Sequence, residues 1–281
     1  MAEYYFNLPP ITALTIPQQA ALDDPAQIAL SGGPGTGKSV VSLWRHISNH
    51  MSNPAKKSLL LTYTTTLKEY LKACCRSQNE DAAKMVATSL KSRDKIHKYK
   101  FAEIIIDEAQ DLDEGYYHGI LSNVSYGADD SQILYPDHCC YQSQLTSLFP
   151  DNVEHVLSKN FRSRESVVDF VNFLFHYLMT QHTGQVDYDR NEELRYGELY
   201  DENNKPTEIM LIPFDKDYKK TNGYSVENKV IAQKIKHMLE NGDEVKDHGS
   251  IRPCRAGDFC ILVQKNDEIT LMAKALEEVG L

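Results

Sequence analysis

The chain has 281 residues, of which 41% are hydrophobic and 25% are charged, a composition typical of a soluble globular protein with one large domain or two smaller ones. It contains no apolar run of the roughly 18 residues that a membrane span needs, and its N-terminus lacks the basic and apolar regions of a secretory signal, so no membrane association is expected. The six cysteines form no C-x-x-C pair, which argues against a zinc ribbon and favours a reducing, cytoplasmic location. The formal net charge of −10 argues against a chain that is basic throughout; a local basic groove is compatible with it, and so is a protein partner.

The first part of the chain alternates short apolar runs with segments of helical periodicity, which is typical of an α/β fold. Strands are predicted over residues 28–30, 58–63 and 101–106 and around Gly127, and helices over residues 40–50, 67–75 and 112–122. We therefore predict a first α/β domain, residues 1–155, in which a parallel sheet carries helices on its faces.

A second α/β domain is predicted over residues 156–281. A strand over 154–157 leads into an amphipathic helix over 163–179, and the polar segment 183–206 then indicates a loop or a small excursion. The later elements are predicted as strands over 208–212 and 259–263, helices over 225–239 and 268–278, and a polar loop over 243–256. Because the chain stops just after a strand–helix pair, we expect this second domain to be incomplete.

The segment Gly32–Ser39, with the sequence GGPGTGKS, matches the pattern G-x-x-x-x-G-K-[ST] completely. It follows a predicted strand and opens a predicted helix, and in this context the glycines let backbone N–H groups face phosphate oxygens. Lys38 would reach the β- and γ-phosphates of ATP, and Ser39 would ligate Mg²⁺. The predicted nucleotide-binding residues of this loop are Gly33, Pro34, Gly35, Thr36, Gly37, Lys38 and Ser39. A chance Gly-rich turn is the alternative, and the complete match in this context argues against it.

A second motif lies at residues 104–111, with the sequence IIIDEAQD. An apolar strand ends there on Asp107 and Glu108, at the edge where ligands bind in parallel sheets. Asp107 would hold Mg²⁺ directly or through water, and Glu108 would orient and deprotonate the attacking water. The two carboxylates could instead cap the next helix, but their pairing with a phosphate-binding loop favours catalysis.

The D-E-A-Q-D form of this motif resembles that of the superfamily 1 helicases of the UvrD/Rep type, and the resemblance covers residues 11–281. It implies a RecA-like P-loop NTPase domain followed by a partial second RecA-like domain. It also implies ATP hydrolysis with Mg²⁺ as cofactor, and action on single-stranded DNA or RNA.

Two segments near the N-terminus are similar to further motifs of that family. Residues 14–22 resemble its Q-motif, which implies that Gln18 contacts adenine through its amide. The sequence LLTYT at the end of the second strand resembles motif Ia, which implies that Thr62, Tyr63 and Thr64 contact single-stranded nucleic acid. For Tyr63, a place in the core at the end of the strand is an equally good interpretation.

Two later segments resemble motifs III and IV, in the order that the family has them. Residues 128–132, ADDSQ, imply that Gln132 senses the γ-phosphate, with alanine in place of the usual glycine. Residues 157–163, LSKNFRS, imply that Phe161 stacks on adenine and that Arg162 is an arginine finger, the alternative for Arg162 being a surface ion pair. The predicted catalytic residues are Lys38, Glu108, Gln132 and Arg162.

The chain departs from the family where accessory parts are expected. A short basic segment, residues 77–99, stands in place of the first accessory domain, and it could contact phosphates or form a solvated helix face. The second insertion domain and motifs V and VI are not found, so we expect either a truncated chain or another chain that supplies them.

Two other classes of function stay open at this point. The first is an ATP-dependent switch without helicase activity, which would change conformation for a protein partner such as a nuclease in bacterial defence. The second is a small-molecule or nucleotide kinase, against which the D-E-A-Q-D motif and the Asn160–Arg162 element argue.

Overall fold

The structure is a computed structural model that describes residues 8–281, except residues 53–56, 93–95, 97–98, 121–122, 184–185, 190–192, 198–206, 214 and 248–249. The chain divides into two compact units, a larger unit over Tyr5–Thr207 and a smaller unit over Glu208–Leu281. Within the described residues, every helix is too short or too polar to cross a membrane.

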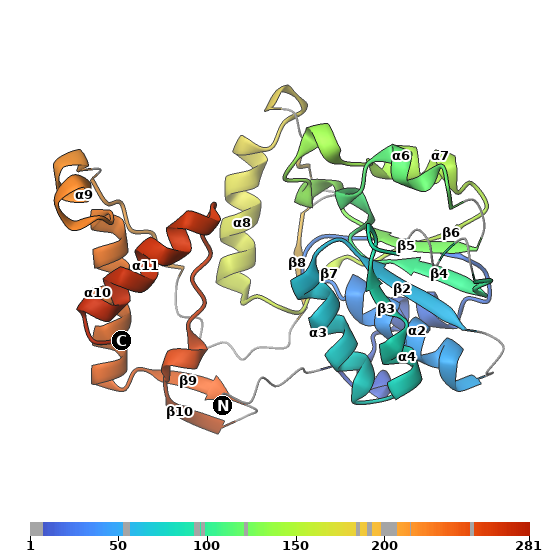
Figure 1. Ribbon diagram of the computed structural model, residues 1–281, viewed down its shortest axis with the longest axis horizontal. Helices are drawn as coiled ribbons and strands as arrows, with labels where there is room; N and C mark the ends of the chain where they lie inside the picture. The colour runs from blue at the N-terminus through green and yellow to red at the C-terminus, as the bar shows by residue number, and fades with distance from the viewer. Residues whose placement is uncertain are drawn as a thin grey trace. The chain divides into compact units, whose positions relative to one another are not determined.

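The larger unit is built on a six-stranded sheet in which all neighbouring strands are parallel (Figure 1). The strand order is β3-β2-β4-β5-β1-β6. The strands are β1 (Ile28–Ser31), β2 (Ser58–Thr62), β3 (Val86–Thr88), β4 (Glu103–Ile106), β5 (Val124–Ala128) and β6 (Val153–Val156). This sheet confirms the predicted α/β, RecA-like P-loop fold, in which the ends of β1 and β4 meet at one edge of the sheet.

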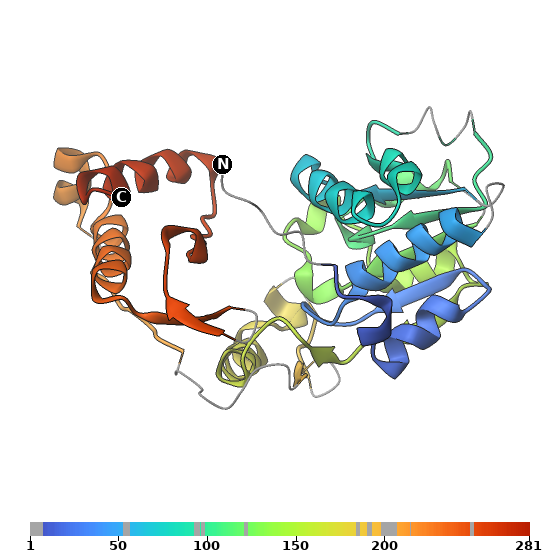
Figure 2. The same ribbon diagram turned by 90° about the horizontal axis from the view of Figure 1, so that it is seen from below.

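Helices cover both faces of this sheet. Those of one face are α1 (Ile16–Asp23), α2 (Lys38–Ser52), α3 (Thr65–Arg76) and α4 (Glu80–Lys84), and those of the other are α6 (Glu114–Tyr117) and α7 (Gln142–Leu148). Seen from below, α2, α3 and α4 lie in front of the strands (Figure 2). Because side chains alternate along a strand, Leu60 and Ile105 join the core under α2–α4, whereas Leu61 and Ile106 pack toward α6 and α7.

Two local predictions in the larger unit need correction, and one strand was not predicted. The predicted helix over 112–122 is limited to α6, and residues 121–122 lie outside the described residues. The Asp113 side chain caps α6 by accepting a hydrogen bond from Tyr116 N–H. Strand β3, between α4 and the DEAQD strand, was not predicted. The segment predicted as a loop over 183–206 is described in part and contains β8 (Arg195–Tyr196), which pairs with β7 (Lys159–Asn160). Helix α8 (Glu165–Leu178) confirms the predicted amphipathic helix.

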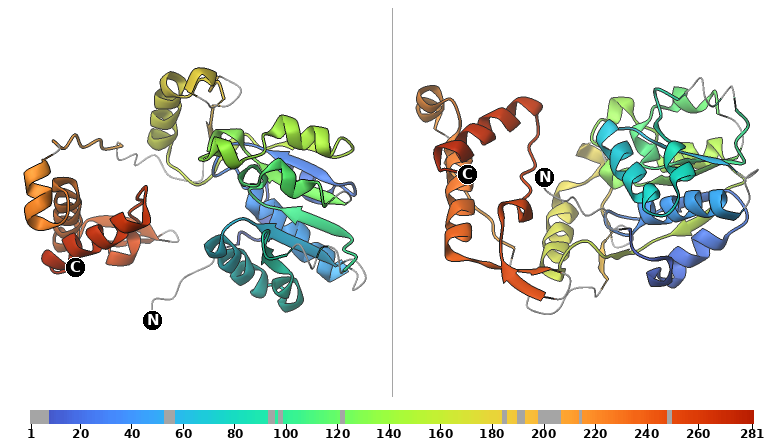
Figure 3. Two further views of the ribbon diagram at one scale, coloured as in Figure 1. Left: turned by 45° about the horizontal axis from the view of Figure 1, so that its top comes forward. Right: turned by 60° about the horizontal axis from the view of Figure 1, so that its bottom comes forward.

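The smaller unit contains α9 (Lys216–Asn222), α10 (Val226–Asn241), α11 (Asn266–Glu278) and a hairpin of β9 (Glu244–Asp247) and β10 (Ser250–Pro253). The predicted helices are confirmed. Figure 3 shows α10 and α11 beside each other, and their small core includes Met272 and Ala232. The prediction of a loop over 243–256 was wrong, because the backbones of β9 and β10 pair there as antiparallel strands.

The two strands predicted in the smaller unit, over 208–212 and 259–263, are not formed. Leu211 and Leu262 are 94% and 90% exposed. A strand needs a paired neighbour to satisfy its backbone groups, and these apolar runs have no such neighbour among the described residues.

Candidate nucleotide-binding site

The phosphate-binding loop connects the end of β1 to the start of α2, as the glycine pattern predicts. Lys38 is folded back over the loop, where its Nζ donates to Gly32 O at 2.6 Å and to Gly33 O at 3.3 Å. The same ammonium group lies 3.7 Å from the Asp129 carboxylate. The Asp129 carboxylate therefore balances part of the positive charge of Lys38 at the loop. Phosphate oxygens would take the place of the two carbonyl groups as hydrogen-bond acceptors for Lys38.

Strand β4 delivers Asp107 into a fully enclosed position beside this lysine. Asp107 is 1% exposed, and neither of its carboxylate oxygens makes a hydrogen bond of normal geometry. Burial, and next the charge of Glu108, raise the pKa of Asp107 to about 7, while the nearby Ser39 hydroxyl and Lys38 ammonium lower it. An unsatisfied buried carboxylate is costly, and a divalent cation held together with Ser39 is the partner that would satisfy it.

Glu108 and Gln132 are joined through two residues whose roles the sequence did not reveal. Gln110 donates from Nε2 to Glu108 Oε2 at 2.9 Å, and its Oε1 accepts from the backbone N–H of Asp129 at 3.2 Å. Asp129 in turn accepts from Gln132 Nε2 at 2.6 Å and faces Lys38. The D-E-A-Q-D and D-D-S-Q segments thus form one polar network, and only the fixed spacing of Gln110 and Asp129 within those motifs could have indicated it.

The backbone of Glu108 adopts a left-handed conformation, with φ 56° and ψ 52°. Such a conformation costs free energy for a residue with a side chain, and it is found most often at functional sites. Glu108 lies two residues after the end of the extended strand β4, and its side chain accepts a hydrogen bond from Gln110.

The segment after β6 lies directly on the phosphate-binding loop. Phe161 N–H donates to Gly35 O at 2.9 Å, and the Asn160 amide reaches Pro34 O. Arg162 follows, with an exposed side chain. Burial raises the pKa of Tyr70 on α3, and the positive charge of Arg162 lowers this pKa by a smaller amount. The structure therefore brings the predicted Phe161 and Arg162 to the loop, within the larger unit.

Gln18 also contacts the loop, from the first turn of α1. Its Nε2 donates to Thr36 O at 2.9 Å, and its Oε1 accepts from Thr15 N–H at 2.9 Å. Gly37, with φ 95°, leaves no room for a side chain, because a Cβ there would lie 2.4 Å from Gln18 Nε2. Gln18 is thus fixed against the loop, and its predicted contact with adenine stays a prediction.

The three predicted nucleic-acid residues differ in exposure. Thr62 is buried with an unpartnered hydroxyl, whereas Tyr63 is 43% exposed. Thr64 is exposed, and its Oγ1 caps α3 by accepting from Leu67 N–H at 3.1 Å. Tyr63 and Thr64 are therefore open to solvent in the structure and Thr62 is not, and Tyr63 is the one of the three whose ring could stack on a base.

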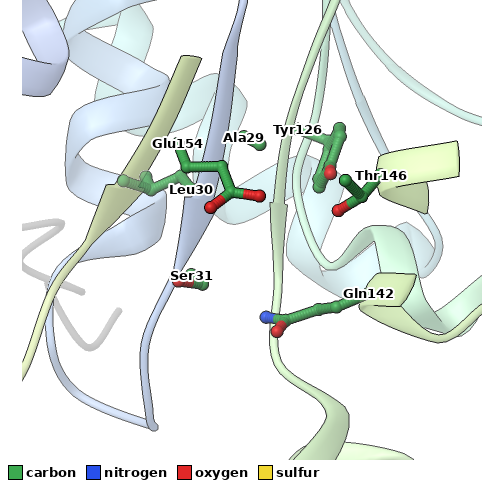
Figure 4. A pocket seen from close by; sticks show the side chains of 7 residues that line it. All are labelled: Ala29, Leu30, Ser31, Tyr126, Gln142, Thr146 and Glu154. Atoms are coloured by element: carbon green, nitrogen blue, oxygen red, sulfur yellow. The ribbon is translucent and has the colours of Figure 1, made fainter. Parts of the chain in front are cut away.

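A small cavity of about 90 Å³ lies beside β1, β5, β6 and α7 (Figure 4). Glu154 of β6, Tyr126 of β5 and Gln142 of α7 are among its lining residues. The cavity contains none of the predicted site residues, and it is far smaller than the roughly 300 Å³ at which ligand pockets begin. It is therefore separate from the nucleotide site.

Comparison with known proteins is consistent with this arrangement. No family model matches the chain. The chain is similar to proteins named as subunits of an ATP-dependent helicase/nuclease, with 30% identity over 210 residues in Listeria innocua, 27% over 215 residues in Ligilactobacillus salivarius and 29% over 216 residues in Bacillus pumilus. These alignments cover 64%, 65% and 66% of this chain, and the chain spans 17% of the length of each of these relatives. The resemblance to superfamily 1 helicases that the motifs indicate is thereby confirmed.

Proposed function

We propose that this chain is the ATP-binding and ATP-hydrolysing core of a superfamily 1 helicase-like protein that acts on single-stranded DNA or RNA. The observation that carries the proposal is the buried, unpartnered carboxylate of Asp107 beside Lys38 and Ser39. Nucleotide phosphates with a divalent cation would satisfy all three groups at once. The names of the relatives, which describe those proteins as ATP-dependent, support the same activity.

Mg²⁺ is the cofactor in this proposal, and when bound it would neutralise charge on the phosphate oxygens. The Ser39 hydroxyl and the Asp107 carboxylate would hold it. Glu108 would orient the attacking water and accept its proton. The hydrogen bond from Gln110 fixes Glu108 Oε2, which leaves Oε1 for the water.

The remaining catalytic residues would act on the phosphates. Lys38 would exchange its carbonyl partners for β- and γ-phosphate oxygens, and Gln132, held by Asp129, would sense the γ-phosphate. Arg162 would stabilise the charge that develops on the transferred group. Gln18 and Phe161 would contact the adenine ring.

Single-stranded nucleic acid would bind at the end of β2. Tyr63 is exposed enough to stack on a base, and the Thr62 and Thr64 hydroxyl groups would contact phosphates after local adjustment. Residues 1–155 would form the first RecA-like, ATP-binding domain and residues 156–281 part of a second. The cytoplasmic location stays a prediction from the sequence.

A second candidate is an ATP-dependent interaction module for a protein partner. The net charge of −10 favours this alternative, and so does the name of the relatives, which describes them as components of a helicase/nuclease. The module would bind ATP through the same residues and bind its partner with an affinity that depends on ATP, without stimulation by nucleic acid.

The test compares ATP turnover of the chain with and without single-stranded DNA and RNA in two variants. Lys38→Ala removes the phosphate contact, so ATP binding and turnover should both be lost. Glu108→Gln keeps the size of the side chain but removes the base, so ATP binding should persist while kcat falls about 100-fold or more.

The two proposals give different results in this experiment. Stimulation of wild-type turnover by a single strand supports the helicase-like core, whereas equal turnover with and without strands supports the interaction module. Wild-type turnover in Glu108→Gln would overturn the catalytic assignment.

A further inference from the structure

Asn160 joins the phosphate-binding loop to the segment of Arg162. The residue lies at the end of β7 and is 2% exposed. Its Nδ2 donates to Pro34 O at 2.7 Å, and its Oδ1 accepts from the backbone N–H groups of Arg162, at 2.9 Å, and of Ser163, at 2.8 Å. A single buried amide group therefore holds the loop at one end and the predicted arginine finger at the other.

The two segments approach each other closely around this amide. Gly35, with φ 74°, follows Pro34, and a Cβ on it would lie 2.7 Å from Asn160 Nδ2 and 2.8 Å from Arg162 Cβ. Only glycine fits such a close approach at positive φ. The bond from Phe161 N–H to Gly35 O adds a second connection. A shift of residues 34–35 when phosphates bind would consequently be passed to the backbone of Arg162.

The contacts of Asn160 serve no other element of the fold in an obvious way. Helix α8 has its N-cap at Arg164 and begins at Glu165, so the bonds of Asn160 to residues 162 and 163 do not cap it. The pairing of β7 with β8 uses backbone groups, including the bond from Gly197 N–H to Asn160 O at 2.9 Å. An asparagine side chain is needed here only for the turn that leads to Arg162 and for the link to the loop.

We propose that Asn160 is a positioning residue that sets Arg162 against the γ-phosphate in response to the state of the phosphate-binding loop. This inference rests on the proposed function, in which Arg162 is the arginine finger. Asn160 itself touches neither the nucleotide nor the water; it acts through Arg162. The consequence is a preference for ATP over ADP that depends on both residues together.

The test is a double-mutant cycle in the full chain, in the Glu108→Gln background so that ATP persists. Asn160→Asp keeps an oxygen for the N–H groups of Arg162 and Ser163 but places a second acceptor against Pro34 O, so it breaks the link to the loop alone. The dissociation constants of ATP and ADP, each with Mg²⁺, are measured for this variant, Arg162→Ala and the double variant. We expect each single variant to lower the preference for ATP, which is the ratio of the ADP to the ATP dissociation constant, about 10-fold. The affinity for ADP should change less than about threefold. The double variant should have the same preference as Arg162→Ala.

The possible results separate this inference from the proposed function. If the two single effects multiply in the double variant, Asn160 acts independently of Arg162 and the inference is overturned, while the proposed function stands. If Arg162→Ala keeps the full preference for ATP, its assignment as the finger is wrong and the inference falls with it. Should Asn160→Asp fail to unfold cooperatively, Asn160→Ser, which offers a shorter neutral acceptor for the same turn, takes its place with the same expected result.

Discussion

The larger and the smaller unit differ in what their apolar segments are packed against. Leu60 and Ile105, on adjacent inner strands of the six-stranded sheet, are enclosed between neighbouring strands and the helices α2–α4. Leu211 and Leu262 belong to equally apolar runs, but they are exposed and outside any strand. An apolar run therefore predicts burial only where the rest of the fold supplies strands on both sides of it.

The hairpin β9–β10 shows the converse case in the smaller unit. Its two strands are rich in charged and polar residues, yet their backbones pair in register, with Ile251 opposite Lys246. The side chain of Arg252 binds both carboxylate oxygens of Asp258, at 2.7 and 2.8 Å. This ion pair, followed by the backbone N–H of Arg255, holds the pKa of Asp258 well below its usual range. Pairing of backbone groups therefore forms strands where the apolar pattern does not predict them.

The largest effect is expected at the buried ion pair of the larger unit. Arg45 binds Glu103 at 2.6 Å and donates to the carbonyl groups of Ala21, Asp24 and Ala26. Arg45→Met should lower the free energy of unfolding by about 3–5 kcal/mol, because it removes the ion-pair partner of the buried Glu103 carboxylate and the donor to three carbonyl groups. Trp44 is the only tryptophan of the chain and belongs to this core, so its fluorescence during urea unfolding measures the change.

The exposed pair of the smaller unit is the matched control for this measurement. In the pair of Arg252 and Asp258 both side chains are 23% exposed, and solvent screens such a pair. Arg252→Met should leave the Trp44 transition unchanged. An equal shift in both variants would show that the two units unfold together and that the comparison between them fails.

A core substitution in each unit gives the next largest effect. Leu60→Ala opens a cavity among strands that cannot collapse onto it, so the Trp44 transition should lose about 2–5 kcal/mol. Met272→Ala acts on the small core of α10 and α11 and should leave that transition in place while it speeds hydrogen exchange in both helices. If Met272→Ala destabilised the larger unit by more than about 1 kcal/mol, the cores would not be independent.

The sequence predicted the elements of the larger unit well because each carries a local signal. Apolar runs of strand length and the glycines of residues 32–37 mark β1, β2 and β4, and helical periodicity marks α3 and α8. Strand β3 was missed because it has three residues between polar segments. The two strands of the smaller unit were predicted in error because the same signal does not state whether a partner strand exists.

The residues of the predicted site differ in the same way in how far the sequence indicates their positions. Lys38, Asp107 and Glu108 come together because parallel strands place their carboxyl ends at one edge. The positions of Gln110 and Asn160 could not be assigned a role in advance. Their side chains bind backbone groups distant in the sequence, Asp129 N–H and Pro34 O, and such bonds leave no periodic pattern.

A smaller, pH-dependent effect is expected from His46 in the larger unit. Its Nε2–H donates to Ala82 O at 3.0 Å and its Nδ1 lies 2.8 Å from Ser58 Oγ, which suits a neutral ring. Burial lowers the pKa of His46 from 6.5 to about 3, and the charge of His50 adds to this. Between pH 6.5 and about 3, the unfolded chain therefore binds a proton at His46 that the folded chain does not bind. The free energy of unfolding should consequently fall by about 1.4 kcal/mol for each pH unit below 6.5.

The variant His46→Gln isolates this contribution from other titrating groups. The unfolding free energy is measured through Trp44 from pH 7.5 to 5 in the wild type and the variant. The value for the wild type minus that for the variant should decrease toward low pH with that same slope. Above pH 7 the difference should be constant. A difference that is flat across the whole range would mean that His46 is accessible to protons in the folded state.

The smallest effect is expected at Leu211, and it decides how the contrast between the units is understood. Leu211 is exposed and lies outside any strand. Leu211→Asn should therefore change the free energy of unfolding by less than about 0.5 kcal/mol and leave hydrogen exchange in α10 and α11 unchanged. If this run instead paired as a strand within the chain in solution, Asn would meet an apolar environment and the loss would be about 2–5 kcal/mol. A neutral result would place the apolar run among surfaces that remain open to a partner, since apolar residues left exposed together commonly mark interaction sites. A costly one would restore the strand predicted over 208–212.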